Sequence, residues 1–362
     1  MTELVLIGAG HVHTALLGHA RTLAEAGIQV TLVDIGSFWF GARRGDLMAG
    51  RADASTLRWP LKTLCRRHAV AHRTDRVVGV DTRLRRVWLA SGARLDYDLV
   101  SFNVGVEVDA TGLNAAASRV RLWRASSVQE LTQFCSELRA SRDGSRVAVV
   151  GDSPDAARLA AALSHACESG RHRVAWYLPG DRFAPWAPSG AARRLARTLS
   201  HRGVEIVLAT PIVGLADGQL VGEDDRRFGV DHLLLAERYR PARVVHAARL
   251  PVGDHGMYVT RRLQSPADSR VFAAGACAQW PDGQSLARHD VAGQAKVLAH
   301  NTVAVVRRRP LRSVGPRAPA SVIDLGDGRA LGWHGSLWWH NRWAARAERR
   351  RIRRLVATLA ID

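Results

Sequence analysis

The sequence predicts an α/β fold with two parallel-sheet units of one kind. The first observation is an apolar strand at residues 4–7, a Gly8-Ala9-Gly10 turn, an Ala/Leu-rich helix at 12–26 and a second strand at 28–33. The second observation is that this order of elements recurs from Gly151 onward. The third is that short strand-like segments with glycine turns follow each unit. Together they favour two Rossmann-like domains, the second inserted in the first.

The first turn has the chemistry of a dinucleotide site. Gly8 permits a sharp turn, and Gly10 lets the backbone approach a diphosphate that the following helix N-terminus attracts. Asp34 follows the second strand, where a carboxylate can accept hydrogen bonds from ribose hydroxyls. His13 stands where the usual motif has its third glycine. The alternative is an ordinary strand–turn–helix unit that happens to turn on glycine.

The second unit sets the expected domain boundaries. A strand at 146–150 leads into Gly151, a helix at 156–167 and a strand at 173–178. We therefore expect three parts: a first dinucleotide-binding domain from residues 1–110 and 251–310, a second from 111–250, and a C-terminal helical region at 311–362.

The composition excludes a disordered or fibrous protein, because 47% of the 362 residues are hydrophobic and 23% are charged. The net charge of +19 favours an anionic partner, such as a phosphate cofactor, a membrane surface or a nucleic acid. The four cysteines form no CxxC pair and stand at no zinc spacing, so we expect no metal site. The sequence shows neither a signal peptide nor a bilayer-length apolar stretch. It predicts a cytoplasmic protein, with peripheral attachment to the inner face of the membrane as an alternative.

Six stretches of the chain carry a family resemblance: VLIGAGHVH (5–13), LDYDLVSFNVG (95–105), LQS (263–265), VFAAGACA (271–278), LAHN (298–301) and GDGRA (326–330). Their order resembles the two-dinucleotide-binding-domain flavoproteins of the pyridine nucleotide-disulfide oxidoreductase superfamily. Within it, the chain is most similar to the type II NADH:quinone oxidoreductase-like branch, which includes the flavoprotein domain fused to some selenide, water dikinases.

The resemblance implies FAD in the first domain and a quinone as the usual electron acceptor of the branch. It places the ADP half of FAD at the first turn, adenine beside the 78–80 backbone, and the flavin ring over the helix that opens at 289–294. The cofactor-binding residues that it implies are Gly8, Gly10, His11, Asp34, Val78, Val80, Asn103, Gly105, Gly275 and Ala276.

The second turn departs from the family pattern. Of its three glycines only Gly151 is kept, and Asp152 and Asp155 place carboxylates where a diphosphate would lie and would repel it. Pro154 removes a backbone donor, and the second strand ends at Leu178 where the family has an acid. We therefore expect a degenerate site that binds NAD(P)H poorly.

The residues predicted to bind flavin depart less from the family pattern. Ala276 replaces an Asp that the family uses near the ribityl chain, a loss of one hydrogen-bonding partner. No catalytic residue is assigned, and the candidates are His11, His289 and Gln294. For His11 and His13 the alternative role is packing, and Cys65 and Cys277 are either redox-active or small buried apolar residues.

An apolar stripe follows three tryptophans near the end of the chain. It predicts either an interfacial helix on an anionic membrane or a helix docked on its own domain or on a second subunit, as in a homodimer. The tryptophans are Trp338, Trp339 and Trp343, and the stripe is Ile352, Leu355, Val356 and Leu359.

Two main functions follow from the sequence. The first is an FAD-dependent oxidoreductase acting on a small molecule or a quinone. The second is a non-catalytic or partner-dependent flavoprotein scaffold, which the altered second turn favours. Binding of nucleic acid is weaker as a hypothesis, because the arginines are dispersed and no recognition motif is present.

Overall fold

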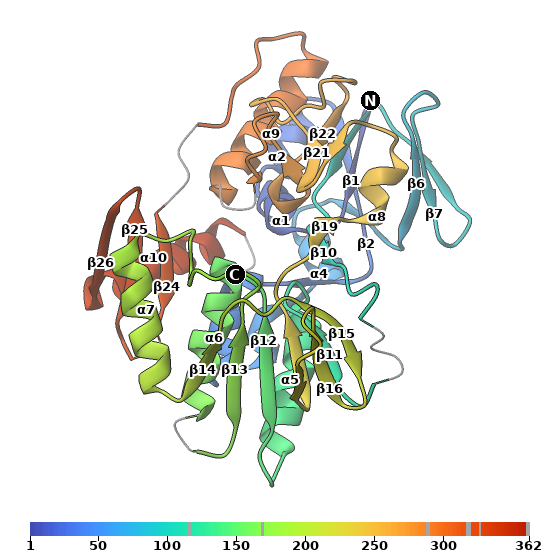
Figure 1. The fold of residues 1–362 in the computed structure, drawn as a ribbon. Helices are drawn as coiled ribbons and strands as arrows, with labels where there is room; N and C mark the ends of the chain where they lie inside the picture. The colour runs from blue at the N-terminus through green and yellow to red at the C-terminus, as the bar shows by residue number, and fades with distance from the viewer. Residues whose placement is uncertain (114–117, 168–169, 287–289, 316–319, 326, 360–362) are drawn as a thin grey trace.

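The structure, a computed structural model, describes residues 1–113, 118–167, 170–286, 290–315, 320–325 and 327–359. Two five-stranded parallel sheets occupy the two halves of the molecule (Figure 1). The first has the order β22 (Val271–Ala273), β9 (Leu99–Phe102), β1 (Thr2–Ile7), β2 (Ile28–Asp34) and β5 (Ala71–Thr74). The second has the order β11 (Arg121–Arg124), β18 (His232–Leu235), β12 (Arg146–Val150), β13 (Arg173–Tyr177) and β14 (Val204–Val207). The predicted fold class is confirmed.

Strand β1 runs into the glycine turn and then into two short helices, α1 (His11–Leu17) and α2 (Ala20–Glu25). The single helix expected at 12–26 is interrupted at Gly18 and His19. Helix α9 (Val291–Val306) packs against α1, so both cover one face of the first sheet. Strands β1 and β12 both run toward the middle of the molecule, which brings the two turns to the junction between the sheets (Figure 1).

A three-stranded antiparallel meander follows β5 and another follows β14, and each parallel sheet takes its remaining strands from later in the chain. The first meander is β6 (Val77–Asp81), β7 (Arg86–Leu89) and β8 (Arg94–Asp96), and the second is β15 (Ile212–Ala216), β16 (Gln219–Gly222) and β17 (Arg227–Gly229). Of the segments at 204–209, 218–221 and 232–236 that the sequence suggested for the second meander, only the middle one lies in it, because β14 and β18 are parallel-sheet strands. The pair β10 (Val106–Val108) and β19 (Tyr239–Pro241) connects the two halves. Other short elements are α4 (Leu61–Arg67), α8 (Arg243–Ala247), β20 (Val252–Gly253), β21 (Gly256–Tyr258) and β23 (Ala278–Gln279).

A strap of residues 41–57 leaves the first sheet and packs on the second half. Its ends are held together by pairing of β3 (Ser37–Trp39) with β4 (Arg58–Pro60). Its helix α3 (Arg44–Met48) packs against α5 (Val128–Ala140) and α6 (Pro154–Cys167), and its leucines lie in the second hydrophobic core. The domain boundaries predicted from the sequence stay a prediction. The strap lies within the first predicted domain, 1–110, but its leucines are buried against the second sheet's core.

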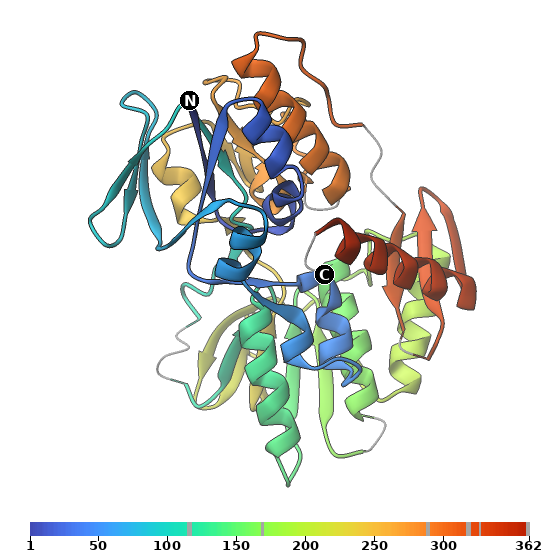
Figure 2. The same ribbon diagram turned by 180° about the vertical axis from the view of Figure 1, so that it is seen from behind.

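The C-terminal part combines a sheet with the expected helix. Strands β24 (Ser321–Asp324), β25 (Ala330–His334) and β26 (Leu337–Asn341) precede helix α10 (Arg342–Thr358), and Figure 2 shows them beside the second half. Trp338 and Trp339 therefore lie on a strand. The apolar stripe at 352–359 packs on the hydrophobic core of the first half, which favours the docked-helix alternative for these side chains.

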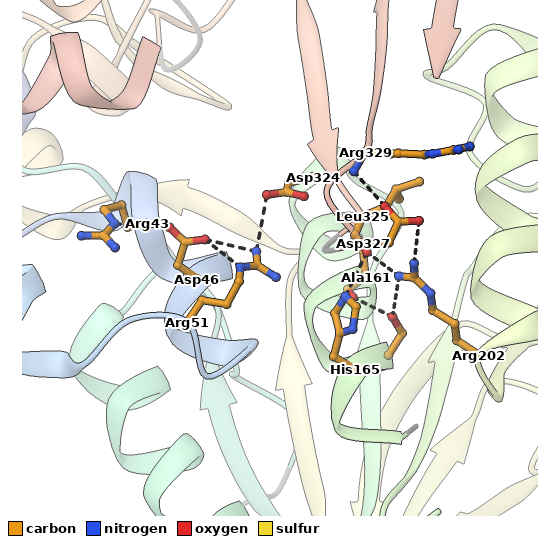
Figure 3. Close-up of polar contacts among 11 residues, drawn as sticks. Arg43, Asp46, Arg51, Ala161, His165, Arg202, Asp324, Leu325, Asp327 and Arg329 are labelled. Carbon is orange, nitrogen blue, oxygen red and sulfur yellow. Dashed lines mark hydrogen bonds and ion pairs between the residues drawn. The ribbon is translucent and has the colours of Figure 1, made fainter. Parts of the chain in front are cut away.

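The turn between β24 and β25 fastens this sheet to its neighbours (Figure 3). The His165 ring on α6 bonds the Leu325 carbonyl at 3.0 Å, and Arg202, just after helix α7 (Ser189–His201), pairs with Asp327 at 3.0 Å. Arg51 of the strap pairs with Asp324 at 3.4 Å. Across the described ranges, none of the helices has the length and apolarity that crossing a bilayer requires.

Candidate functional site at the junction of the two sheets

The first turn is shaped by its contact with Asn103. Gly8 has a φ of +84°, a conformation that residues with a side chain rarely adopt. A Cβ at Gly10 would lie 2.4 Å from the Asn103 Oδ1 and 2.5 Å from its carbonyl oxygen. Because both atoms stand closer than any Cβ tolerates, the second glycine is required here by the protein's own packing.

Most of the polar groups around the first turn are satisfied, but one donor is left. Asn103 Oδ1 accepts hydrogen bonds from the backbone N–H groups of Val12 (3.0 Å) and His13 (3.1 Å). Within the described ranges, the His11 N–H at the start of α1 has no acceptor. Asp34 Oδ2 accepts from the Ala9 N–H at 2.7 Å, which holds the carboxylate beside the turn. The His11 N–H and the Asp34 carboxylate therefore both lie at the first turn. This arrangement fits a phosphate and a ribose.

The environment of Asp34 is partly apolar. Burial raises the pKa of this carboxyl, and hydrogen bonds from the backbone of Ala9 act in the opposite direction. A buried acid of this kind gains from further donors, and ribose hydroxyls would supply them.

His13 fills the position of the third glycine as a packing residue. Its ring is fully buried, with Nδ1 at 2.7 Å from the Gly8 carbonyl and Nε2 at 2.8 Å from the Ser101 hydroxyl. Burial lowers its pKa to about 4. The imidazole joins the turn to β9 and is neutral near pH 7, so the packing alternative is favoured.

A stability measurement tests this role of His13. Unfolding exposes a histidine of ordinary pKa near 6.5, whereas the folded one stays neutral to about pH 4. Between these values the unfolded state binds more protons, so stability should fall as the pH falls, by about 3 kcal/mol in total. His13→Asn should flatten this acid limb in urea unfolding at pH 7, 5.5 and 4.5. Identical pH profiles for the two proteins would contradict the assignment.

His11 lies at the junction itself. Its ring stands between Phe38 (5.2 Å between centroids) and Phe40 (5.4 Å). Its Nε2 is buried and has no partner within the part of the chain that the structure describes, and burial together with the nearby Arg44 charge lowers its pKa to about 4. An unpaired buried polar atom is uncommon in proteins, and at this place it fits a ligand hydrogen bond.

Gln294 and Gly275 form the opposite wall of the first turn. Gln294 is buried, and its Oε1 accepts from the Gly275 N–H at 2.9 Å. Asn103 Nδ2 donates to the Ala274 carbonyl at 2.7 Å, so one side chain holds both glycine segments in place. Gln294 thus acts on the shape of the site, and Ala276 beside it offers no carboxylate. His289 lies outside the described residues.

The other sequence-predicted residues are dispersed around the turn. Val80 is buried and pairs with Val87 in the first meander, while Val78 is exposed at a bulge of the same strand. Gly105 has a φ of +73° and open space at its Cβ position. Their predicted contacts with adenine and FAD stay predictions.

The second turn is closed by the chain's own side chains. The Trp186 indole N–H donates to Asp152 Oδ1 at 2.8 Å. The Ser153 hydroxyl donates to the Ala236 carbonyl and accepts from the Ala156 N–H, both at 3.1 Å. Helix α6 begins at Pro154, which has no N–H to offer.

Asp155 is neutralised where the sequence suggested repulsion. Its Oδ1 accepts from Arg44 and from Arg158, each at 2.8 Å. These two guanidinium groups hold the pKa of the carboxyl far below its usual range, against the effect of burial. The predicted repulsion of a phosphate by Asp155 is therefore offset, and the obstacle at this helix N-terminus is the ion pair that already fills it.

The sequence reasoning missed three residues of the junction: Arg44, Trp186 and Tyr239. Arg44 comes from the strap, and Trp186 packs on Trp333 of β25 at 5.6 Å. The Tyr239 hydroxyl is buried and has no partner among the residues described, and burial together with Asp155 raises its pKa. Only the position of Tyr239, three residues after Ala236 and the second sheet, could have drawn attention to it.

Comparison with known proteins assigns the family. Residues 2–297 match the family described as pyridine nucleotide-disulphide oxidoreductase, which covers most of the chain. The chain belongs to this family of oxidoreductases. The superfamily expectation is confirmed, whereas the type II NADH dehydrogenase branch and the selenide, water dikinase link stay predictions. The search of curated proteins found no match to this sequence.

Solved structures of several oxidoreductases have the same fold at low sequence identity. The sulfide:quinone oxidoreductase of Aquifex aeolicus is 14% identical with a TM-score of 0.81, covering 99% of this chain and 91% of its own. The water-forming NADH oxidase of Lactobacillus brevis is 17% identical with a TM-score of 0.74, covering 92% and 75%. A putidaredoxin reductase, in covalent complex with putidaredoxin, is 18% identical with a TM-score of 0.73, covering 91% and 80%.

The cysteines that the structure describes form no disulfide in this family member. Cys65, Cys135 and Cys277 are buried and free, and burial raises the pKa of each thiol to about 11. The Cys277 thiol donates to the carbonyls of Ala274 and Phe102. Such thiols remain protonated near neutral pH, so the small-apolar-residue alternative is favoured for Cys65 and Cys277. The Cys167 side chain lies outside the description.

Proposed function

We propose that this oxidoreductase binds FAD at the first turn and acts as a flavin-dependent enzyme of the type II NADH dehydrogenase-like kind. The observation that carries the proposal is the contrast between the turns. At the first, the His11 N–H has no acceptor among the described residues and Asp34 lies at the same turn; at the second, Asp152, Ser153 and Asp155 are all bonded within the chain.

Each residue of the first turn has a separate role in this proposal. Gly8 and Gly10 allow the turn to pack closely on Asn103, the His11 N–H donates to the diphosphate, and Asp34 accepts from the ribose. Gln294 holds Gly275 beside the ribityl chain. FAD, when bound, supplies hydride and electron transfer, and the His11 ring and Tyr239 hydroxyl offer hydrogen bonds at the junction.

The absorbance spectrum of the purified protein tests the proposal most directly. Bands at the usual flavin positions, with FAD released by denaturation, support it. A colourless protein that FAD cannot reconstitute would exclude it.

The second candidate is a partner-dependent flavoprotein scaffold without its own reductant. The closed second turn favours it, and a putidaredoxin reductase of the same fold was captured in covalent complex with putidaredoxin. Photoreduction of the flavin followed by exposure to quinones separates the candidates, because only an enzyme reoxidises rapidly with a specific acceptor.

A quinone acceptor would bring the protein to a membrane surface, and peripheral attachment remains part of the proposal. The helical stripe is committed to the first core, so the exposed anchors would be Leu337 (73% exposed), Trp338 (43%) and Trp343 (72%), with Arg346 over the Trp343 ring. Indole rings favour the headgroup region and arginines favour anionic lipids.

Vesicle binding tests this attachment. Trp338→Ser combined with Trp343→Ser should weaken binding to phosphatidylglycerol vesicles by about tenfold or more, since each large apolar side chain contributes up to a few kcal/mol. Raising the salt concentration should weaken binding further. Trp88→Ser on β7, where the indole is 38% exposed, is the matched control. If the wild-type protein ignores such vesicles at low salt, the attachment is excluded.

A further inference from the structure

We propose that a groove along the outer face of α7 binds an acidic polypeptide segment of a partner protein. Two depressions adjoin there, with volumes of about 310 and 390 Å³, and both are lined by Ala196. The first opens between the 182–189 loop and the start of α7, and the second continues to Ser200 and His201 at its end. Together they follow the whole helix.

The groove carries positive charge along its length. The sequence of α7, SGAARRLARTLSH, contains three arginines and no acidic residue. Its leucines are buried, and the exposed Arg193 and Arg197 line the depressions together with Arg182 of the preceding loop. In the described part of the chain none of these three arginines forms an ion pair. An acidic partner would find three guanidinium groups along one groove.

The floor of the groove is apolar and made of small residues. Ala184 and Ala192 line it, and Phe183 closes one side with its edge against the Trp176 ring at 5.2 Å between centroids. A concave, alanine-lined floor between arginines fits a chain that carries short apolar side chains between acids. A lipid surface would instead need protruding apolar side chains, and single-stranded nucleic acid would need exposed aromatic faces for stacking.

The walls of the groove are held in place by the rest of the fold. The Trp338 indole of β26 packs against Gly190 at the start of α7. Arg202, just after the end of α7, pairs with Asp327 (Figure 3). The binding surface is therefore formed before a partner arrives, which lowers the entropic cost of association. The groove lies on the outer side of the second half, so the inference is independent of the proposed FAD site.

The test uses a fluorescein-labelled peptide of alternating glutamate and alanine and the full-length protein. Fluorescence anisotropy at low salt should show binding that rising salt abolishes. Arg193→Glu combined with Arg197→Glu should weaken this binding by about tenfold or more. The matched control is Arg83→Glu with Arg94→Glu, two exposed arginines of the first meander, which changes the net charge equally. Thermal unfolding should be unchanged in both variants, since all four side chains are exposed.

The outcomes separate a built groove from diffuse attraction by a protein of charge +19. Selective loss in the α7 variant supports the proposal. Equal loss in both variants, or no peptide binding at low salt, overturns it. A different result is that the α7 variant keeps peptide binding and selectively loses binding to phosphatidylglycerol vesicles or to single-stranded DNA. That result also overturns the proposal, because the occupant would then be a lipid or a nucleic acid.

Discussion

Replacing Gly10 with valine should leave the purified protein without flavin. The Cβ alone would lie 2.4 and 2.5 Å from two atoms of Asn103, so the turn or the Asn103 segment must move. Asn103 also caps α1 and holds the Ala274 carbonyl, and the displacement would therefore reach both glycine segments of the proposed site. We expect flavin content to fall below about a tenth of the wild-type value, with a stability loss of about 1–3 kcal/mol from overpacking.

Two further variants separate the loss of binding from a general fault in folding. Gly315→Val places a side chain where no described residue lies within 4 Å, and flavin content should be unchanged. Asp34→Asn keeps an oxygen that accepts from the Ala9 N–H but removes the charge, so the fold should persist while FAD affinity falls by about ten- to a hundredfold. Wild-type flavin content in Gly10→Val would contradict the assignment of this turn.

The local parts of the fold could be predicted from the sequence because their signals are local. Strand β12 occupies the predicted residues 146–150, and β1 and β2 extend the predicted strands only at their ends. Apolar runs bounded by glycine turns leave few alternatives for such segments. The helix at 12–26 was predicted as one element, and the break at Gly18 follows from a residue of poor helix propensity within it.

The strap and the C-terminal sheet could not be predicted, because their partners are distant in the sequence. Leu47 and Leu57 are apolar residues in a short irregular segment, and nothing near them indicates burial against α5 and α6. In β25, Leu331 and Trp333 alternate toward the second core, but the sequence analysis predicted no strand in this region and only the helical stripe after the tryptophans. Packing between segments that are distant in the sequence determines the structure of both the strap and the C-terminal sheet.

The altered residues of the second turn were visible in the sequence, but the side chains that contact them were not. Missing glycines and an added proline can be read directly from residues 151–155. The partners that close the turn come from elsewhere: Arg44 from the strap and Trp186 from the loop before α7. The sequence predicted poor nucleotide binding from the lost glycines, Pro154, the missing acid and charge repulsion. The structure adds side-chain contacts that already occupy the turn.

NADH and NADPH should accordingly be poor reductants of the flavin-loaded protein. A dinucleotide at the second turn needs a close-approach glycine, free N–H groups at the helix start and, for NADH, an acid at the ribose. The chain offers Ser153 bonded to Ala236, Pro154 at the start of α6, and Leu178 fully buried where the acid would stand. Displacing the Arg44–Asp155 ion pair would leave charges unpaired in a partly buried place, which opposes binding further.

Anaerobic stopped-flow mixing of the oxidised flavoprotein with NADH or NADPH measures the rate at which each nucleotide reduces the flavin. Bleaching of the flavin band should be slow and should not saturate below about 1 mM nucleotide, the upper end of the usual range for substrates. Dithionite, which needs no binding site, should bleach the same sample fully and serves as the control. The positive surface charge would raise the local nucleotide concentration, but it cannot supply the missing N–H donors at Pro154. Fast bleaching that saturates at micromolar NADH would show that the second turn opens to admit the nucleotide, because the contacts of Asp152 and Asp155 must then break.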